Sequence, residues 1–334
     1  MQAVILGQPG WHADELRRAL EARGHAGRVV PYESLVASFG GGRAEAGALL
    51  SGQEPVLDAD AVLARFIPAG SLEQIIYRVD ALHWIEDRGV AIVNSPRAIE
   101  RSVDKFCTDA RLRAAGVPTP ETFVCERAAD AMTAIRAILG CGPALPTVSG
   151  TGPTCLARAW PPGPAAISRA VVIKPIFGSM GHGIVRVTDP DVAFRVVQTL
   201  EQLRSVFYVQ RAIESGGRDI RVFVVGGRVL GAIERRAAAG DWRTNVSRGG
   251  SARPIDLPPD WESIALRATA AIGADYAGVD LLPSIDGEVF VLEVNGIPGW
   301  QGLQRATGID VAGAVVDHLV ERVRSRRSAA VGQA

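Results

Sequence analysis

The sequence predicts an α/β protein of two or three domains, and three features support this fold class. The amino-terminal part alternates short apolar strands with helical patterns, which predicts a small parallel sheet flanked by helices. Two later segments each contain a pair of apolar strands joined by a glycine-containing turn, which is typical of β-hairpins. A length of 334 residues provides enough chain for a sizeable core in more than one domain.

The overall composition narrows the class of partner. Lysine plus arginine equals aspartate plus glutamate at 36 each, so the net charge gives no general attraction for nucleic acid or an anionic membrane. The cysteines show no CxxC spacing, which favours reduced thiols over a zinc site or a disulfide framework. No apolar run reaches membrane-spanning length, and no basic signal region precedes the first strand. We therefore expect a cytoplasmic protein with neither a nucleic-acid nor a membrane partner.

The amino-terminal helices and strands are predicted from the spacing of apolar residues and from the glycine and proline residues that end them. The expected elements are a strand at residues 3–7, a helix through Leu16 and Leu20 that stops at Gly24, a strand at 61–64, a helix at 72–87 and a strand at 90–93. Pro96 disfavours helix before it and can open a helix after it. We place the end of the first domain at residue 95.

A second α/β unit follows this boundary. Its expected elements are a helix at residues 104–115, a strand at 122–125 and a helix at 128–139. Residues 140–169 are rich in proline and glycine and show neither helical nor strand periodicity, which indicates an insertion at the surface. A functional lid is the alternative for this insertion. Regular structure resumes with a strand at residues 171–175.

A glycine-rich loop comes directly after the strand that contains Lys174. Its key residues are Gly178, Ser179, Gly181 and Gly183. Glycines let backbone amides approach an anion closely, successive amides can form a concave nest for phosphate, and Lys174 would add positive charge. It is neither a Walker loop nor a dinucleotide loop, because no helix follows the glycines. An ordinary tight turn remains the alternative.

The segment from residue 219 to 236 predicts a hairpin that turns at Gly226-Gly227. Its second strand runs into Arg235, and Arg243 and Asn245 follow shortly afterwards. Guanidinium groups and an amide near one strand end can clamp a phosphate or a carboxylate, because arginine offers a planar fork of donors. We take these three residues as candidate catalytic residues. The alternative is a solvated basic edge that discourages sheet pairing.

The last hairpin carries two carboxylates and an amide. A two-residue turn at Asp286-Gly287 would place Asp280 directly opposite Glu293, with Asn295 on the same face two residues later. Oxygen ligands without cysteine or histidine suit a hard cation and favour Mg²⁺, with Mn²⁺ as an alternative, and imply a nucleotide phosphate nearby. An acidic face in solvent is the other interpretation, but the apolar residues 289–292 argue against it.

These segments, in this order, resemble the ATP-grasp superfamily and, more narrowly, its RimK-like glutamate ligases, over residues 90–325. The resemblance rests on Asp104-Lys105, Lys174 with the glycine loop, Gln210, Asp219-Ile220-Arg221, Glu234 to Arg236, Trp242 to Asn245, Arg248 to Gly250, Asp280 and Glu293 to Asn295. It implies an amino-terminal Rossmann-like domain followed by a two-subdomain ATP-grasp fold. The implied division is 1–95, 96–212 with the insertion 140–169, 213–327, and a tail at 328–334.

The resemblance also implies roles for individual residues. Lys174 would contact the nucleotide phosphates with help from Lys105, and Asp219 would lie near the ribose. The adenine-binding segment would be Gln210, Arg211, Ala212 and Ile213, and the Mg²⁺ ligands would be Asp280, Glu293 and Asn295. Relatives usually have an acidic and then an aromatic residue after the glutamine. This departure leaves side-chain contacts with adenine open and does not affect contacts from the backbone.

The implied activity is that of an ADP-forming carboxylate–amine ligase, in which ATP converts a carboxylate into an acyl phosphate that an amine attacks. Residues 295–303 resemble the branch that adds L-glutamate to tetrahydromethanopterin-type cofactors, with Trp300 either a stacking surface for a flat ring or a core residue. The partners would be L-glutamate and a small-molecule substrate. Two alternatives stay open: glutamate addition to a protein tail, and a nucleotide-binding regulatory module without ligase activity. The sequence shows no interface signature, although relatives are often oligomers.

Overall fold

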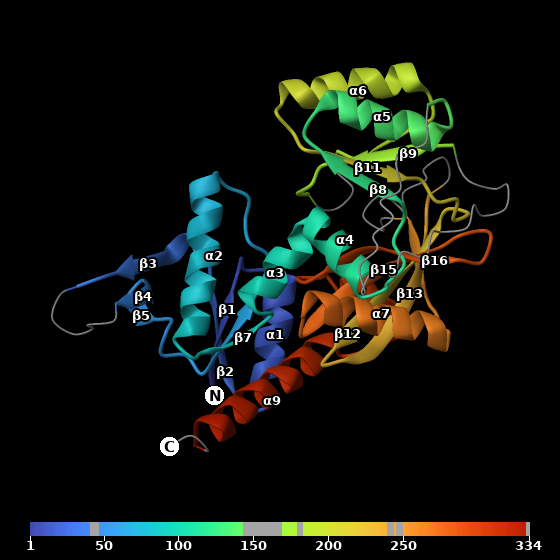
Figure 1. The fold of residues 1–334 in the computed structure, drawn as a ribbon. Coiled ribbons are helices and arrows are strands. Elements are labelled where there is room, and N and C mark those ends of the chain that lie inside the picture. Colours follow the sequence, from blue (N-terminus) through green and yellow to red (C-terminus); the bar gives the residue numbers. More distant parts are fainter. Residues whose placement is uncertain (41–46, 143–168, 179–182, 239–243, 245–249, 332–334) are drawn as a thin grey trace.

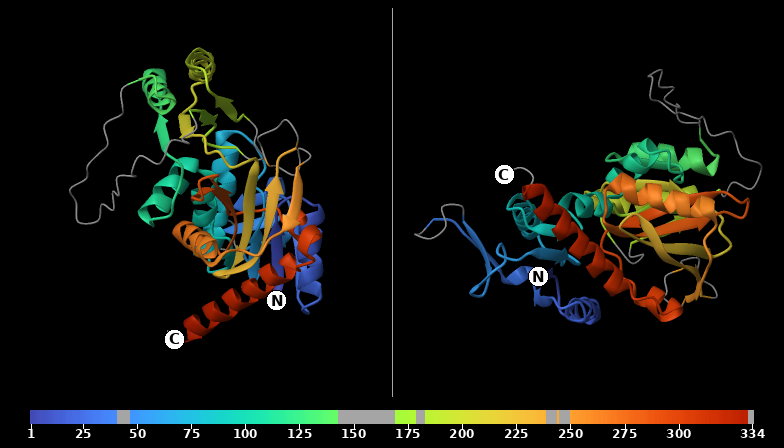
Figure 2. Two further views of the ribbon diagram at one scale, coloured as in Figure 1. Left: turned by 90° about the vertical axis from the view of Figure 1, so that its right-hand side faces the viewer. Right: turned by 90° about the horizontal axis from the view of Figure 1, so that it is seen from below.

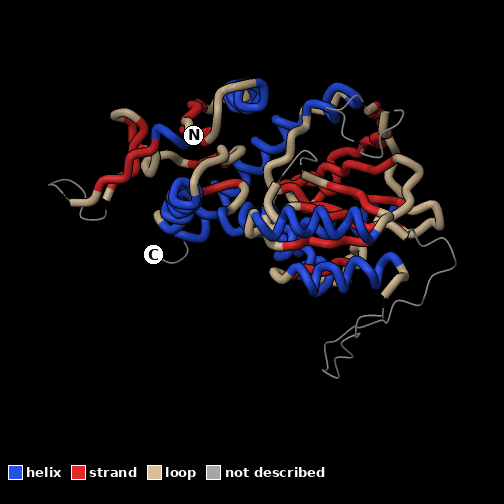
Figure 3. The backbone as a smooth tube through the Cα atoms, turned by 90° about the horizontal axis from the view of Figure 1, so that it is seen from above, coloured by secondary structure: helices blue, strands red, loops and turns tan. Residues whose placement is uncertain are grey.

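The computed structural model describes residues 1–40, 47–142, 169–178, 183–238, 244 and 250–331. Within these ranges the strands form a parallel sheet, two larger antiparallel sheets and a small antiparallel sheet, with helices packed against them (Figure 1). The amino-terminal part lies beside the two larger antiparallel sheets when the molecule is seen from above (Figure 3). This mixed architecture confirms the predicted α/β fold class.

The amino-terminal sheet is parallel, with the strand order β2-β1-β6-β7. Its strands are β1 (Gln2–Leu6), β2 (Ala26–Val30), β6 (Ala61–Ala64) and β7 (Ala91–Val93), and its first two helices are α1 (Trp11–Glu21) and α2 (Leu72–Asp87). Helix α2 begins where the sequence predicts, because Ser71 and Gln74 form a capping box there. Elements that the sequence did not predict follow β2: the 3₁₀ helix η1 (Tyr32–Ser34) and the small sheet of β3 (Leu35–Ser38), β4 (Ala48–Ser51) and β5 (Glu54–Pro55).

Two short helices connect this sheet to the rest of the molecule. Helix α3 (Pro96–Val103) starts with Pro96 at its first turn, as expected, and Ser95 caps it. Helix α4 (Lys105–Ala114) is capped by Asp104, whose side chain accepts a hydrogen bond from the Cys107 amide. The extended backbone at Asp104 separates the two helices and fixes Lys105 at the start of α4.

The central sheet is antiparallel, with the strand order β10-β9-β11-β8. Its strands are β8 (Thr122–Cys125), β9 (Val171–Lys174), β10 (Val185–Val187) and β11 (Phe207–Arg211). Helices α5 (Ala128–Leu139) and α6 (Pro190–Gln202) lie next to each other on one face (Figure 1). Apolar residues from these helices and strands form a separate core for this part of the chain.

The five-stranded sheet is also antiparallel, with the order β14-β13-β12-β15-β16. Its strands are β12 (Arg218–Val225), β13 (Arg228–Arg236), β14 (Ser251–Pro254), β15 (Tyr276–Pro283) and β16 (Val289–Asn295). Gly226 and Gly227 both adopt positive φ, 56° and 74°, so the predicted β12–β13 turn is confirmed. Helix α7 (Pro259–Ile272) packs on one face, against residues such as Val222 and Val224.

The other face of the same sheet is covered by the carboxy-terminal helices α8 (Gln301–Thr307) and α9 (Val311–Val331). Helix α9 runs from the five-stranded sheet back to the amino-terminal part and packs against α1 (Figure 2). One apolar cluster therefore contains residues of β1, α1, β12 and α9 together with Trp300. Helix α9 continues to Val331, past residue 328, where we expected a tail to begin. None of the helices in the described ranges is both long and apolar enough to cross a membrane.

Candidate functional site

The β15–β16 hairpin brings the two predicted carboxylates together. Asp280 pairs directly with Glu293, as expected from the sequence, and Asn295 pairs with Gly278. The turn prediction was wrong, because the Ser284 amide bonds to the Glu288 carbonyl at 2.7 Å and the loop therefore holds three residues, 285–287. A register shift between Asp280 and Leu281 compensates for the extra loop residue. The predicted pairing of Asp280 with Glu293 is thus correct, although the loop is longer than predicted and the strand contains a register shift.

Cross-strand pairing also places two arginines beside these carboxylates. Arg221 on β12 lies directly opposite Asp280 on β15, and Asp219 lies directly opposite Arg235 on β13. Residues 219 and 221 are two apart and therefore share one sheet face. The face thus carries a row of alternating charges, and it is covered well enough that Asp219, Arg235 and Asp280 are all buried.

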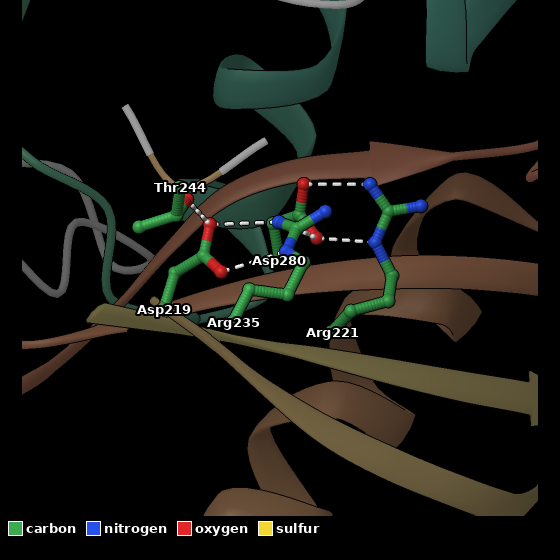
Figure 4. A network of polar contacts seen from close by, with 5 residues as sticks. All are labelled: Asp219, Arg221, Arg235, Thr244 and Asp280. Carbon is green, nitrogen blue, oxygen red and sulfur yellow. Dashed lines mark hydrogen bonds and ion pairs between the residues drawn. The ribbon is translucent and has the colours of Figure 1, made fainter. Parts of the chain in front are cut away.

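These residues and Thr244 form an ion-pair network (Figure 4). Arg221 binds Asp280 through both Nε and Nη2, the latter at 2.9 Å from Oδ2. Arg235 binds Asp219 with two bonds of 2.7 Å and also reaches Asp280 Oδ1 at 2.9 Å. Thr244 Oγ1 donates to Asp219 at 2.5 Å. Bidentate pairing of this kind fixes the carboxylate planes as well as their positions.

The environment separates the two facing carboxylates electrostatically. Burial disfavours the charge of Asp280, but Arg221 and Arg235 outweigh it and hold the pKa of Asp280 below its ordinary value. Burial, together with the charge of Asp280, raises the pKa of Glu293, and the nearby cations offset this only in part. Asp280 is therefore a fully compensated anion, whereas Glu293 still lacks a matching positive charge.

The donor set fits a hard divalent cation. Within the described part of the chain, no hydrogen bond or ion pair engages the side chain of Glu293 or Asn295. Asp280 Oδ2 accepts only one of the hydrogen bonds from Arg221, which leaves room for a further ligand. Among the described residues, no group of three His, Cys, Asp or Glu side chains is arranged to hold a metal ion, and the amide oxygen of Asn295 would be the third donor beside Asp280 and Glu293.

Two lysines approach the same space from the other side. Lys174, the last residue of β9, donates from Nζ to Gln210 Oε1 at 2.7 Å. Lys105 donates to the carbonyls of Ile176, at 3.3 Å, and Gly178, at 3.0 Å, and so ties α4 to the glycine loop. Burial lowers the pKa of Lys174 to about 8, and burial also lowers the pKa of Lys105, while the charge of Glu293 opposes both shifts. This influence of Glu293 on both lysines indicates that they share one site with the carboxylate hairpin.

Some of the remaining predicted residues lie in the described part of the structure and others do not. Gly178 and Gly183 have positive φ, 151° and 71°, as a glycine loop requires. Ser179, Gly181, Arg243 and Asn245 lie outside the described residues. In the segment predicted to bind adenine, Gln210 turns inward to Lys174, and Arg211 pairs with Glu121 at 2.8 Å. Ala212 and Ile213 follow at the end of β11. The open question about adenine thus points to the backbone of this segment, because the first two side chains are already engaged.

One hypothesis about the substrate pocket was wrong. Trp300 is completely buried, with its ring 4.6 Å from the His12 ring and 4.6 Å from Arg65 Cζ. It is therefore a core residue, and its ring is not a surface for stacking. Burial and the charge of Arg65 lower the pKa of His12 to about 4, so this packing holds a neutral imidazole.

Sequence reasoning missed the residues that brace the site from the amino-terminal part. Asn94 is fully buried, donates to the carbonyls of Tyr276 and Gly296, and accepts from the amides of Asp275, at 2.6 Å, and Tyr276, at 3.0 Å. It therefore fixes the start of β15 and the residue that follows Asn295. Arg65 adds bonds to the Tyr276 hydroxyl and the Pro298 carbonyl at 2.9 and 3.2 Å. No local pattern signals these contacts, whereas Arg221 could have been found from its spacing to Asp219.

Comparisons with known proteins identify the family of this chain. Residues 164–319 match the family model of the RimK-like ATP-grasp domain. The tetrahydromethanopterin:alpha-L-glutamate ligase of Methanosarcina acetivorans is 33% identical over 344 residues, which cover 95% of this chain and 97% of that protein. A probable alpha-L-glutamate ligase of Trichodesmium erythraeum is 33% identical over 322 residues, with 95% of each chain covered.

Solved structures of ATP-grasp proteins share the fold. The ATP-grasp ligase PsnB, complexed with a minimal precursor, superposes with a TM-score of 0.69 at 21% identity and covers 96% of this chain and 98% of its own. A further structure of PsnB, with minimal precursor, Mg and ADP, gives a TM-score of 0.67 at 20% identity with the same coverage. The RimK domain protein of Sphaerobacter thermophilus gives 0.65 at 21% identity, covering 96% and 100%.

Proposed function

The chain belongs to the RimK-like ATP-grasp ligases, and from that premise we propose that it uses ATP and Mg²⁺ to add L-glutamate to the carboxylate of a pterin-type cofactor. The activity is that of a carboxylate–amine ligase that releases ADP. The finer assignment, a pterin acceptor, draws support from a relative that is 33% identical over 95% of the chain and is named for that acceptor. Such similarity over nearly the whole length includes the parts that surround the site.

The observation that carries the proposal is the meeting of two unlike groups of residues. On the five-stranded sheet, Asp280 and Glu293 face each other with Asn295 on the same side. From the central sheet and α4 come two lysines whose oxygen partners are an amide and backbone carbonyls. Oxygen donors for Mg²⁺ opposite uncompensated cations suit a triphosphate with its metal ion, and PsnB holds Mg and ADP in a similar fold.

The proposed chemistry needs no nucleophilic side chain. A carboxylate oxygen of the acceptor attacks the γ-phosphorus of ATP, the bond to the β-phosphate oxygen breaks, and ADP leaves. The amine of L-glutamate then attacks the acyl carbon, expels phosphate and loses its proton, which gives the amide. Mg²⁺, when bound, would neutralise charge on the transferring phosphoryl group.

The protein's own residues position these reactants. Lys174 and Lys105 would draw the phosphates toward the glycine loop, and Arg235, held by Asp219 and Asp280, would present a fixed guanidinium at the strand end. Asp219 would lie near the ribose with its carboxylate already paired to Arg235. Catalysis would then come from positioning and electrostatic stabilisation rather than from a covalent intermediate with the enzyme.

The test is a ligation assay with defined acceptors. The protein is incubated with ATP, Mg²⁺ and L-glutamate together with a tetrahydromethanopterin-type pterin, a glutamate-ended peptide or no acceptor. ADP release and the acceptor mass are then measured. ADP release that depends on the pterin, with a mass gain of one glutamate residue or more, is expected. Mass gain on the peptide alone would replace the pterin with a protein tail, and nucleotide binding without turnover would leave only a regulatory module.

A further inference from the structure

Behind Lys174 lies a group of polar side chains that the proposed chemistry does not use. We call it the Lys174 support network, and its members are Asp109, Thr122, Tyr208 and Gln210. Helix α4 supplies Asp109, β8 supplies Thr122, and β11 supplies the other two residues. Gln210, Tyr208 and Asp109 are buried, with 2%, 1% and 8% of their surface exposed. Polar groups this deeply buried are costly unless their bonds are satisfied.

The bonds of the network run in one direction, away from Lys174. Lys174 Nζ donates to Gln210 Oε1 at 2.7 Å. Gln210 Nε2 donates to Thr122 Oγ1 at 3.0 Å and to the Tyr208 hydroxyl at 3.2 Å, and that hydroxyl donates to the Asp109 carboxylate. Both amide hydrogens of Gln210 are therefore used. The amide can only keep its oxygen toward Lys174, because a flip would break both donor bonds.

The network orients the ammonium group without cancelling its charge. The atom that accepts from Lys174 belongs to a neutral amide, and the network's carboxylate, Asp109, lies beyond the tyrosine hydroxyl. A carboxylate in direct contact would form a buried ion pair, which an incoming phosphate would first have to displace. A neutral acceptor fixes the direction of the lysine and leaves its charge for an anion that arrives later.

We propose that Gln210, Tyr208 and Asp109 are positioning residues that hold Lys174 as an oriented, uncompensated cation for the phosphates of the nucleotide. This inference rests on the proposed function only in that a nucleotide binds at Lys174. It does not depend on which acceptor is used. Tyr208 and Asp109 act through Gln210, and Gln210 acts through Lys174.

Direct nucleotide binding gives the sharpest test. The dissociation constant of the non-hydrolysable analogue AMPPNP with Mg²⁺ is measured by calorimetry for the full chain, without acceptor or glutamate. Gln210→Glu, which puts a carboxylate against Lys174, should weaken binding about 100-fold, since it pairs the cation directly. Tyr208→Phe should weaken binding about 5-fold, because one hydrogen bond that fixes Gln210 is lost.

Two further variants separate positioning from general packing. Asp109→Asn keeps an acceptor for the Tyr208 hydroxyl and should bind within about 2-fold of the wild type, whereas Asp109→Leu should match Tyr208→Phe. Tyr77→Phe is the matched control, because Tyr77 also donates one hydroxyl bond, to the Leu35 carbonyl at 3.0 Å, in the amino-terminal part. It should leave AMPPNP binding unchanged.

Steady-state kinetics add a readout that a purely structural role would not move. Tyr208→Phe should raise KM for ATP and leave kcat and KM for L-glutamate within about 2-fold, because only the phosphate contact is affected. The inference would be overturned if folded Gln210→Glu protein bound AMPPNP as tightly as the wild type does. It would also be overturned if Tyr208→Phe raised KM for ATP and KM for L-glutamate equally. A wild type that binds AMPPNP but fails with the pterin would refute the proposed acceptor alone, and a wild type that does not bind AMPPNP would overturn both.

Discussion

The central sheet together with helix α4 brings two cations to the candidate site, and the five-stranded sheet brings two more, but the groups that bind these cations differ. Lys174 and Lys105 are bound by an amide oxygen and by backbone carbonyls, and burial lowers the pKa of both. Arg221 and Arg235 are bound directly by carboxylates. Burial opposes the charge of Arg235 as well, yet Asp280 and Asp219 raise its pKa above the ordinary value.

This difference teaches how one site can separate structural from ligand-binding charge. The arginines form ion pairs within the protein, so they orient the carboxylates and leave less charge for a further anion than the lysines do. The lysines leave their charge unpaired, so they attract phosphate at some cost to the stability of the empty protein. The same contrast holds for the anions, with Asp280 paired and Glu293 unpaired.

The largest effect is expected from the unpaired carboxylate. Glu293→Gln should lower turnover by about 10³-fold or more, because it removes the charge of a residue that we propose as a metal ligand. Its free energy of unfolding should stay the same or rise at neutral pH, since burial raises the pKa of Glu293 and the variant removes that buried charge. ADP release and urea unfolding measure the two quantities.

Asp280→Asn is the matched comparison for this variant. It should lose turnover similarly but also lose about 3 kcal/mol of unfolding free energy, because Arg221 and Arg235 lose a buried partner. The two guanidinium groups are the reason that only the Asp280 variant should lose stability. Equal stability of the two variants would contradict the contrast between paired and unpaired carboxylates.

The next largest effect concerns the cations. Lys174→Met should raise KM for ATP about 10- to 100-fold while the unfolding free energy stays the same or rises, since a buried cation without a charged partner in contact is removed. Arg235→Met should instead cost about 3 kcal/mol of stability, because Asp219 and Asp280 both lose a guanidinium partner. Loss of stability in Lys174→Met comparable with that in Arg235→Met would show that the lysine is paired after all.

The third prediction concerns the pH dependence of nucleotide affinity and of stability that Lys174 causes. Burial lowers the pKa of Lys174 from 10.5 to about 8, so AMPPNP affinity should fall as pH rises through that value. Stability should move in the opposite direction. Between the folded value of about 8 and the unfolded value of 10.5, the unfolded chain binds more protons at this residue, so its contribution to unfolding free energy rises with pH.

Lys174→Met provides the reference for both pH curves. The difference between wild type and variant isolates the lysine from other groups that titrate in the same range. Calorimetry gives the affinity and urea unfolding gives the stability, each from pH 6.5 to about 9.5, which brackets the shifted pKa. Identical pH dependence in the two proteins would remove Lys174 from the phosphate site.

The smallest effect is expected from a change beside Arg221, which tests whether its position matters for Asp280. A Cβ at Gly278 would lie 2.8 Å from Arg221 Nη1 and 2.9 Å from Pro298 Cβ, so Gly278→Ala must displace the guanidinium from Asp280. We expect a loss of about 1–2 kcal/mol in unfolding free energy and a few-fold loss of turnover. Gly302→Ala is the control, because its new Cβ meets only Ile233 Cδ1, at 3.9 Å. Wild-type turnover in Gly278→Ala would show that Arg221 does not orient Asp280.

Much of the fold was predictable because local sequence patterns determine it. The helix at 72–87 has its capping box, the turn at Gly226-Gly227 has its two glycines, and the pairing of Asp280 with Glu293 follows from strand alternation. The last prediction was right for an incomplete reason, since a longer loop and a bulge cancel each other. A bulge leaves no clear signal in the sequence, because it changes the pairing without changing the residue types.

What could not be predicted depends on contacts between distant segments. Asn94 joins the end of β7 to both strands of the β15–β16 hairpin, and Tyr208 on β11 donates to Asp109 on α4. These residues belong to no periodic pattern that differs from ordinary core or loop. Trp300 shows the reverse case, because its place after the predicted metal ligands suggested a ligand surface while the packing of α1 and β12 buries it.

The apolar cluster that α9 shares with α1, β1 and β12 has a mechanical consequence. Because one core spans the amino-terminal sheet and the five-stranded sheet, and Asn94 links them again, we expect these two parts to move as a single rigid body. The central sheet has its own core and is joined to that body through the connections at residues 115–121 and 212–217. Any hinge rotation that admits ATP and frees ADP should therefore swing Lys174, Tyr208 and Gln210 toward or away from a stationary carboxylate hairpin. Asp109 stays with α4, so its bond to Tyr208 lies across the hinge.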